Sequence, residues 1–214
     1  MSAQKNHNKR RFLFRWVGFS ALALFFGLIF SFTLALFVAS YLGEIINKPI
    51  ANAIGYSILG GGTGALVGLA QWKMLRKEIH ISARWILTCA GGLAIAELIA
   101  GLALIIIGSD RDLVQESQNI PIYTLIYTFG GALVGLLQHS EFEKFSSKSI
   151  LWIYACSLSW GATIMILQIG FSMDKPIPVI IAFLLGLFAL GLITGFFLIR
   201  IIGTDKLSSS KINS

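Results

Sequence analysis

Six long apolar segments constrain the fold of this chain more than any other feature of its sequence. Their approximate boundaries are 17–41, 51–72, 85–108, 121–138, 150–172 and 177–202. A helix needs roughly 20 mostly apolar residues to cross the hydrocarbon core of a bilayer, and each segment meets or approaches that length. Only 13% of the 214 residues are charged, whereas soluble domains carry about 25%. The sequence therefore predicts an all-α fold, a polytopic membrane protein with six transmembrane helices.

A β-barrel and a cleaved signal peptide both fit these segments less well. A transmembrane β-barrel would alternate apolar and polar side chains along strands of about ten residues, but these segments are apolar on every side. A cleaved signal peptide has an apolar core of about 7–15 residues, and the first segment is longer than that. We therefore expect the first segment to be a retained membrane anchor.

The lysine and arginine residues indicate the orientation of the chain. With six crossings, 14 of its 17 Lys and Arg residues lie on the side that holds both ends. Cytoplasmic segments carry such an excess, so both termini are predicted to be cytoplasmic. The expected parts are a basic N-terminus at 1–15, a transmembrane domain at 16–202 and a mobile cytoplasmic tail at 203–214. Topology then accounts for the net charge of +7 without a nucleic-acid partner, and the lipid bilayer is the expected neighbour.

An internal repeat links the second and fourth segments. A shift of 67 residues superposes 64–89 on 131–156 with 12 identities in 26 positions, including the run GALVGL and one Trp. A weaker third copy appears when the unit is taken as one hairpin, which begins at a Trp and carries two glycines in its second helix. The sequence therefore predicts three tandem hairpins in the same orientation, packed about an axis along the membrane normal.

The glycines of the repeat are spaced for helix packing. Lipid gives helices no hydrophobic drive to associate, and glycines four residues apart let a neighbouring helix approach closely. The predicted packing residues are Gly60, Gly64, Gly68, Gly131, Gly135, Gly191 and Gly195.

Tryptophan and glutamine also recur with the repeat. The tryptophans that begin the odd-numbered helices, and that we expect to anchor the chain at the cytoplasmic membrane surface, are Trp16, Trp85 and Trp152. Gln71 and Gln138 follow the glycines in two copies, where an amide can bond a neighbouring helix end or a Trp indole N–H. Leu198 stands at this position in the third copy. A ligand role for the two glutamines is the alternative.

The run GALVGLAQWKMLR at 64–76, followed by RWIL at 84–87, resembles a group of uncharacterised polytopic membrane proteins of cyanobacteria and other bacteria, whose repeats read GxxxGxxQWxxLR. The second copy departs from this pattern, with His139 in place of Trp and Phe142-Glu143 in place of Leu-Arg. The resemblance covers roughly 55–165 and implies the membrane class and the duplication, without an activity. The expected location is the inner or plasma membrane of the cell, or the thylakoid membrane if the chain is cyanobacterial.

Glu97 is the one acidic residue inside a predicted span. An ionised carboxylate at this depth is costly, so such residues face the bundle and often mark a path for ions or protons. Helical spacing places Ala94 and Gly101 on the same face. Glu97 is either a proton or cation site, or a protonated acid that bonds a neighbouring helix. Gln168, toward the non-cytoplasmic end of the fifth segment, could line a cavity with Glu97 or form a simple interhelical hydrogen bond.

The other polar groups form no recognisable catalytic arrangement. Cys89 and Cys156 hold equivalent positions in the repeat and are expected to be buried free thiols. The histidines lie outside the spans, and no nucleophile–base or phosphate-binding motif occurs. The acidic segment SDRDLVQESQNIP at 109–121 is expected to be a solvated face. We therefore expect no metal, no cofactor and no enzymatic activity.

Two functions remain open from the sequence. The first is a non-enzymatic membrane protein that acts through helix–helix contacts, as an accessory, assembly or scaffold component with a second membrane protein as its partner. The second is a small-solute or ion/proton transporter with Glu97 in the pathway. A water-accessible cavity that touches Glu97 would favour transport, whereas a sealed bundle would favour the packing role.

Overall fold

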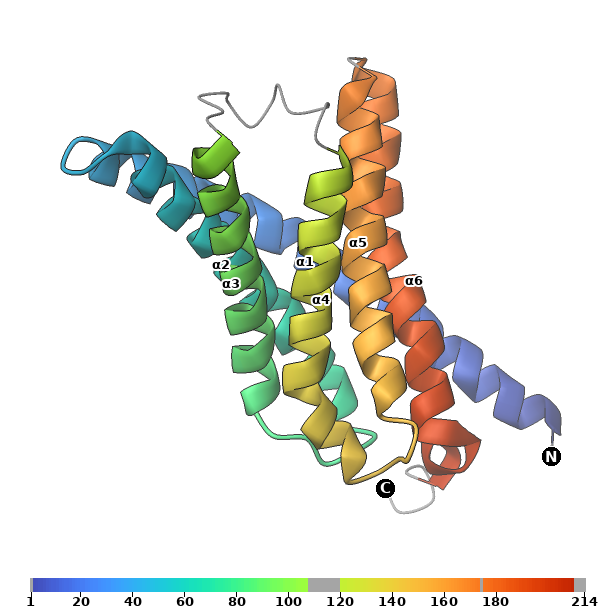
Figure 1. Ribbon diagram of the computed structural model, residues 1–214. Helices are drawn as coiled ribbons and strands as arrows, with labels where there is room; N and C mark the ends of the chain where they lie inside the picture. The colour runs from blue at the N-terminus through green and yellow to red at the C-terminus, as the bar shows by residue number, and fades with distance from the viewer. Residues whose placement is uncertain (1, 108–119, 174, 210–214) are drawn as a thin grey trace.

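Six helices form the part of the chain that the structure describes. This structure, a computed structural model, describes residues 2–107, 120–173 and 175–209 (Figure 1). The helices are α1 (Ser2–Gly43), α2 (Lys48–Leu75), α3 (Arg84–Ile107), α4 (Ile120–Glu143), α5 (Ile150–Ser172) and α6 (Pro176–Ser209). All six are long and apolar enough to cross a membrane. The architecture is that of a multi-pass α-helical membrane protein.

Most of the helices extend beyond the predicted spans. α1 begins at Ser2, so the basic N-terminus continues the first membrane helix. α6 continues to Ser209, into the segment predicted to be a mobile tail, and α4 runs past 138 to Glu143. Apolar composition locates the part of a helix that lipid can surround, but a helix continues into polar sequence until a breaker or a cap ends it. The acidic residues of the segment at 109–121 lie outside the described residues.

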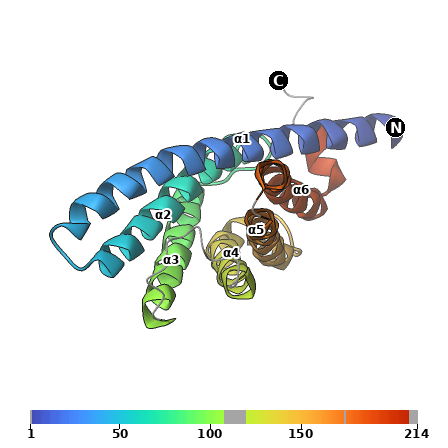
Figure 2. The ribbon, with the colours of Figure 1, turned by 90° about the horizontal axis from the view of Figure 1, so that it is seen from above.

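Each helix packs against its neighbours in the chain, and α6 also packs against α1. Seen from above, α1 runs along one side of the bundle, and α4, α5 and α6 are viewed nearly end-on (Figure 2). The first half of α1 and the second half of α6 lie at the same end of the bundle (Figure 1). A hydrogen bond of 2.9 Å from Trp16 Nε1 to Thr194 Oγ1 joins these two helices there.

Four aromatic side chains fill the core at this end. Trp16, Trp85, Trp152 and Phe142 are fully buried, and we call them the aromatic plug. The ring centroid of Trp152 lies 6.4 Å from that of Trp16, 5.4 Å from that of Trp85 and 5.1 Å from that of Phe142. Aromatic pairs at such distances add about 0.5–1.5 kcal/mol each beyond the burial of their surface. The plug therefore ties α1, α3, α4 and α5 together.

The prediction that the three tryptophans anchor the chain at the membrane surface is wrong. A fully buried indole cannot reach the lipid headgroups, and these indoles point into the bundle. The position of a Trp at the start of a span sets its depth in the membrane. Whether it faces lipid or protein depends on the rotation of the helix, which the packing against neighbouring helices fixes.

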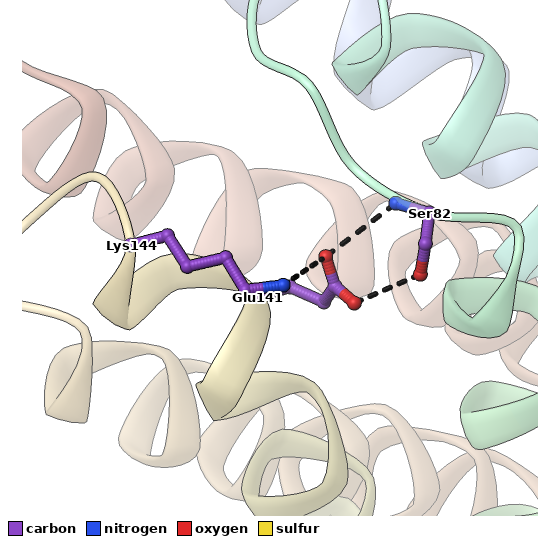
Figure 3. A network of polar contacts seen from close by, with 3 residues as sticks. All are labelled: Ser82, Glu141 and Lys144. Atoms are coloured by element: carbon purple, nitrogen blue, oxygen red, sulfur yellow. Dashed lines mark hydrogen bonds and ion pairs between the residues drawn. The ribbon is translucent and has the colours of Figure 1, made fainter.

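A polar contact at the same end joins the connection between α2 and α3 to α4. The carboxylate of Glu141 accepts hydrogen bonds from the hydroxyl of Ser82 at 2.8 Å and from its backbone N–H at 3.4 Å (Figure 3). Lys144 Nζ lies 3.5 Å from the same carboxylate. The α2–α3 connection is thus fixed to the end of α4 by side-chain bonds.

Candidate functional site

A cavity of about 80 Å³ lies within the bundle. All six helices contribute side chains to its wall, including Leu28, Thr63, Glu97, Tyr127, Thr163 and Leu187. One water molecule needs roughly 10–15 Å³ of such space, so the cavity has room for a few waters or for a ligand of a few heavy atoms. Most of the wall is leucine, isoleucine and aromatic side chains, and none of its described residues is Lys, Arg or His.

Glu97 supplies the only carboxyl group among the described residues of the cavity wall. It is 6% exposed, and its Oε1 accepts a hydrogen bond from the hydroxyl of Tyr127 on α4. Gly60 on α2 provides the room for this side chain, because a Cβ at Gly60 would lie 2.5 Å from Glu97 Cγ. Glu97 therefore bonds a neighbouring helix and also lines a cavity. Tyr127 accounts for one of the two carboxyl oxygens.

Two threonine hydroxyls add to the polar part of the wall. Thr163 donates a hydrogen bond of 3.3 Å to the carbonyl oxygen of Gly186. Thr63 is 3% exposed, and its hydroxyl has no hydrogen-bond partner among the described residues. A buried hydroxyl without a partner costs about 1–3 kcal/mol of desolvation. A ligand that bonded the hydroxyl of Thr63 would remove this cost.

Residues that are 67 positions apart meet at this cavity. Gly60 and Tyr127 are such a pair, and both lie against Glu97. Glu97 and Ile164 are another, and both line the wall. The wall thus repeats in position but not in chemistry, because the carboxyl and the phenol each occur in one copy only. The polar site is asymmetric.

Gln168 is not among the described residues that line this cavity, which counts against one of the two uses considered for it. The residues of α5 that face the cavity are Trp160, Thr163, Ile164 and Leu167. At 100° per residue, Gln168 lies roughly 90° around the helix from the centre of that stripe. The other use, a simple interhelical hydrogen bond, stays a prediction.

The glycines predicted for helix packing lie against other helices of the same chain. A Cβ on Gly64 would lie 2.5 Å from the carbonyl oxygen of Cys89, and one on Gly68 would lie 3.1 Å from the Cα of Ile86. Both contacts are to α3. Neither glycine has space for the methyl group of an alanine, because backbone atoms of α3 lie too close. The backbones of α2 and α3 are therefore in direct contact here.

The other two pairs of glycines make corresponding contacts. Gly131 lies against the carbonyl group of Cys156, and a Cβ on Gly135 would lie 2.7 Å from the Cα of Ile153. These contacts of α4 with α5 are those of α2 with α3, shifted by 67 residues.

On α6, the third pair faces the first helix. A Cβ on Gly191 would lie 2.8 Å from the Cα of Val17, and one on Gly195 would lie 2.8 Å from Cδ1 of Trp16. Each even-numbered helix therefore presents its glycines to an odd-numbered helix, and α6 presents them to α1.

The amide of Gln138 supports the aromatic plug. Its Oε1 accepts a hydrogen bond of 2.8 Å from Trp152 Nε1, and its Nε2 donates one of 3.3 Å to the carbonyl oxygen of Trp85. These are a Trp indole and a neighbouring helix end, the two kinds of partner that the sequence suggested. Gln71 is also buried, but Trp85 Nε1 has no hydrogen-bond partner among the described residues. The two glutamines are thus equivalent in sequence but not in bonding.

Three residues of the site and plug were not found from the sequence. Tyr127 could have been noticed because it replaces Gly60 in the second copy. Thr194 accepts the indole bond of Trp16 in the third copy, where the glutamine is missing, and it lies one helical turn before Leu198. Thr63 carried no signal, because a threonine within a glycine-rich helix usually serves packing.

The two cysteines are free and buried, as predicted. Among the side chains that the structure describes, no group of three His, Cys, Asp or Glu could hold a metal ion. Comparisons with protein-family models, with curated proteins and with solved structures found no match. Function is therefore inferred from the site itself.

Proposed function

We propose that this protein is a non-enzymatic membrane transporter that takes a proton, a cation or another small solute into the cavity at Glu97. One observation carries the proposal: a buried carboxyl group lines a cavity whose wall is built from all six membrane helices. An ionisable residue at this depth is costly to keep, and such residues typically mark a path for ions or protons. A carboxyl needed only for packing would not require a cavity beside it.

The aromatic plug favours a carrier over an open channel. Along α3, Trp85 precedes Glu97 by 12 residues, which corresponds to about 18 Å of helix. The plug therefore separates the cavity from the end of the bundle where α1 begins. A solute could pass that end only after the plug moves, as in a carrier that opens to one side at a time.

We also propose that the helices form three tandem hairpins in the same orientation, with both termini in the cytoplasm of a bacterial cell. The corresponding glycine contacts of α2, α4 and α6 support the hairpins. The excess of Lys and Arg on the side of the termini supports the orientation. Reporter fusions at residue 1 and residue 214 test it, and reporters on opposite faces of the membrane would contradict both statements.

Action through contacts with a second membrane protein remains a prediction. Its main motivation was the set of glycine faces, but these faces are in contact with other helices of the same chain. A partner protein would therefore have to bind a different surface. Cross-linking and co-purification in mild detergent test this function, and a stable stoichiometric partner would support it over transport.

The transport proposal is tested with purified protein in sealed lipid vesicles. Flux of protons is followed with an internal pH dye, and flux of cations or solutes with isotopic tracers. The variant is Glu97→Gln, which keeps the size of the side chain and removes its charge. The matched control is Glu143→Gln, because Glu143 also lies on a helix but is 60% exposed.

We expect flux with the native protein and with Glu143→Gln, and a loss of at least tenfold with Glu97→Gln. Circular dichroism and gel filtration establish that each variant is folded. Native protein without flux of any tested species, or equal flux with Glu97→Gln, would contradict the proposal.

A further inference from the structure

The polar groups of the cavity differ in what they can still bond. Tyr127 donates to Glu97, and Thr163 donates to Gly186. The bond from Tyr127 engages one carboxyl oxygen of Glu97, Oε1, and the hydroxyl of Thr63 has no partner among the described residues. The wall therefore offers hydrogen-bond acceptors to a ligand, one of them on an acidic group, and a suitable ligand carries several N–H or O–H donors.

The number of oxygen atoms argues against a bare metal ion. Hard cations such as Ca²⁺ and Mg²⁺ take about six to eight oxygen ligands. The cavity offers the side-chain oxygens of four residues, and the rest of its wall is hydrocarbon, aromatic or glycine. A dehydrated metal ion would therefore keep too few oxygen ligands here.

A small primary ammonium ion fits both parts of the wall. Its –NH₃⁺ group has three donors, which Glu97 and Thr63 can accept, and its charge offsets that of the carboxylate. Tyr127 and Trp160 bring aromatic rings to the same wall, and aromatic faces attract ammonium groups. Its alkyl part suits the leucine side chains. About 80 Å³ holds about five to eight heavy atoms at 10–15 Å³ each, so the alkyl part must be short.

We infer that the cavity is a binding site for a compact primary alkylammonium ion, held by Glu97 and Thr63. This inference rests on the proposed function, because it names the solute class of the same site. A ligand of two or three heavy atoms gains at most about 1.5 kcal/mol per atom. The dissociation constant is therefore expected near or above about 1 mM, and titrations must extend to tens of millimolar.

The test is ligand-dependent thermal stability of the purified protein in detergent. The probes are methylammonium and ethylammonium chloride. The controls, at equal ionic strength, are sodium chloride, potassium chloride and tetramethylammonium chloride, which has a positive charge but no N–H donor. A ligand that binds only the folded state raises the midpoint temperature of unfolding. Once its concentration exceeds the dissociation constant, the rise is proportional to the logarithm of that concentration.

Three variants locate the effect. Thr63→Val keeps the shape of the side chain and removes its hydroxyl, Glu97→Gln removes the charge, and Leu187→Phe fills the cavity without touching either group. We expect the midpoint of thermal unfolding to rise in this logarithmic way with the two primary ammonium ions, with a dissociation constant at least fivefold weaker in Thr63→Val and no response in the other two variants. Thr63→Val removes an unpaired hydroxyl, so it should fold as well as the native protein.

An equal rise with sodium or tetramethylammonium, or an unchanged dissociation constant in Thr63→Val, would overturn the inference. Its failure is distinguishable from failure of the transport proposal. Proton flux that depends on Glu97, without any response to ammonium ions, would refute the ligand class and leave transport standing. Absence of both flux and ligand response would refute the two together.

Discussion

The contact between α2 and α3 predicts a large difference between two glycine-to-alanine substitutions. At Gly64 a Cβ would lie 2.5 Å from the carbonyl oxygen of Cys89 and 3.0 Å from the Cα of Ala90. Both are backbone atoms, so α2 and α3 would have to move apart. At Gly91, on α3, a Cβ would meet nothing within 4 Å. Gly64→Ala and Gly91→Ala are therefore the same chemical change in a crowded place and in an open one.

The magnitude follows from two opposing terms. Alanine favours a helix over glycine by up to about 1 kcal/mol, and this term applies to both variants. Overpacking a close contact costs about 1–3 kcal/mol, and this term applies only to Gly64→Ala. The propensity term cancels in the comparison, so Gly64→Ala should be less stable than Gly91→Ala by about 1–3 kcal/mol. Gly131→Ala should behave like Gly64→Ala, because Gly131 lies against Cys156 in the corresponding contact.

The assay is reversible unfolding of the purified protein in mixed micelles with increasing sodium dodecyl sulfate. Tryptophan fluorescence reports the transition, because three of the five tryptophans belong to the aromatic plug. We expect Gly64→Ala and Gly131→Ala to unfold at a lower detergent fraction than Gly91→Ala. Equal midpoints for all three variants would refute the close approach of the helices.

Three further predictions concern the plug, the thiols and the loop contact. Gln138→Leu leaves Trp152 Nε1 and the carbonyl of Trp85 without a partner, so it should cost about 1–3 kcal/mol of stability per buried group. Gln71→Leu breaks no such bond to a Trp and should cost less in the same unfolding assay. Cys89 and Cys156 are buried, so maleimide labelling followed by mass spectrometry should find them unreactive in the folded protein and reactive after denaturation. Fast labelling of either thiol before unfolding would count against the packing of α3 and α5. Ser82→Ala should cost about 1 kcal/mol by removing a bond to Glu141, whereas Lys144→Ala should cost less because Lys144 is 62% exposed; the reverse order in thermal unfolding would contradict the bonds of Figure 3.

Composition and length were enough to predict the helical membrane class. Runs of apolar residues long enough to cross a bilayer have few alternatives, since unpaired backbone groups are too costly in lipid. The ends of the helices were less predictable, because polar sequence such as QHSEFE can remain helical after the membrane ends. The bounds of α5 agree with the span predicted from the sequence, whereas α1 and α6 extend beyond their predicted spans.

The rotation of each helix decided which site residues were found. Glu97 was identified because a lone acid in a span must face protein. The tryptophans of the plug were given the wrong surroundings, because uniformly apolar helices have no polar side that fixes their orientation. Tyr127 and Thr194 act through partners on other helices that are 30 and 178 residues away in the sequence. No local pattern contains such partners.

Six helices can surround one cavity only if α1 and α6 are in contact, and a chemical cross-link between them tests this most directly. Phe25 of α1 and Phe183 of α6 are suited to it, since their ring centroids are 6.1 Å apart beside the cavity. Cysteines at these two positions should be joined in native membranes by a short thiol-specific cross-linker, and mass spectrometry of the linked peptides detects the product. A cysteine at Phe30, which is 65% exposed, should not be linked to the one at 183. We expect the link between 25 and 183 alone; no link there, or equal linking from 30, would contradict the closed bundle and the cavity within it.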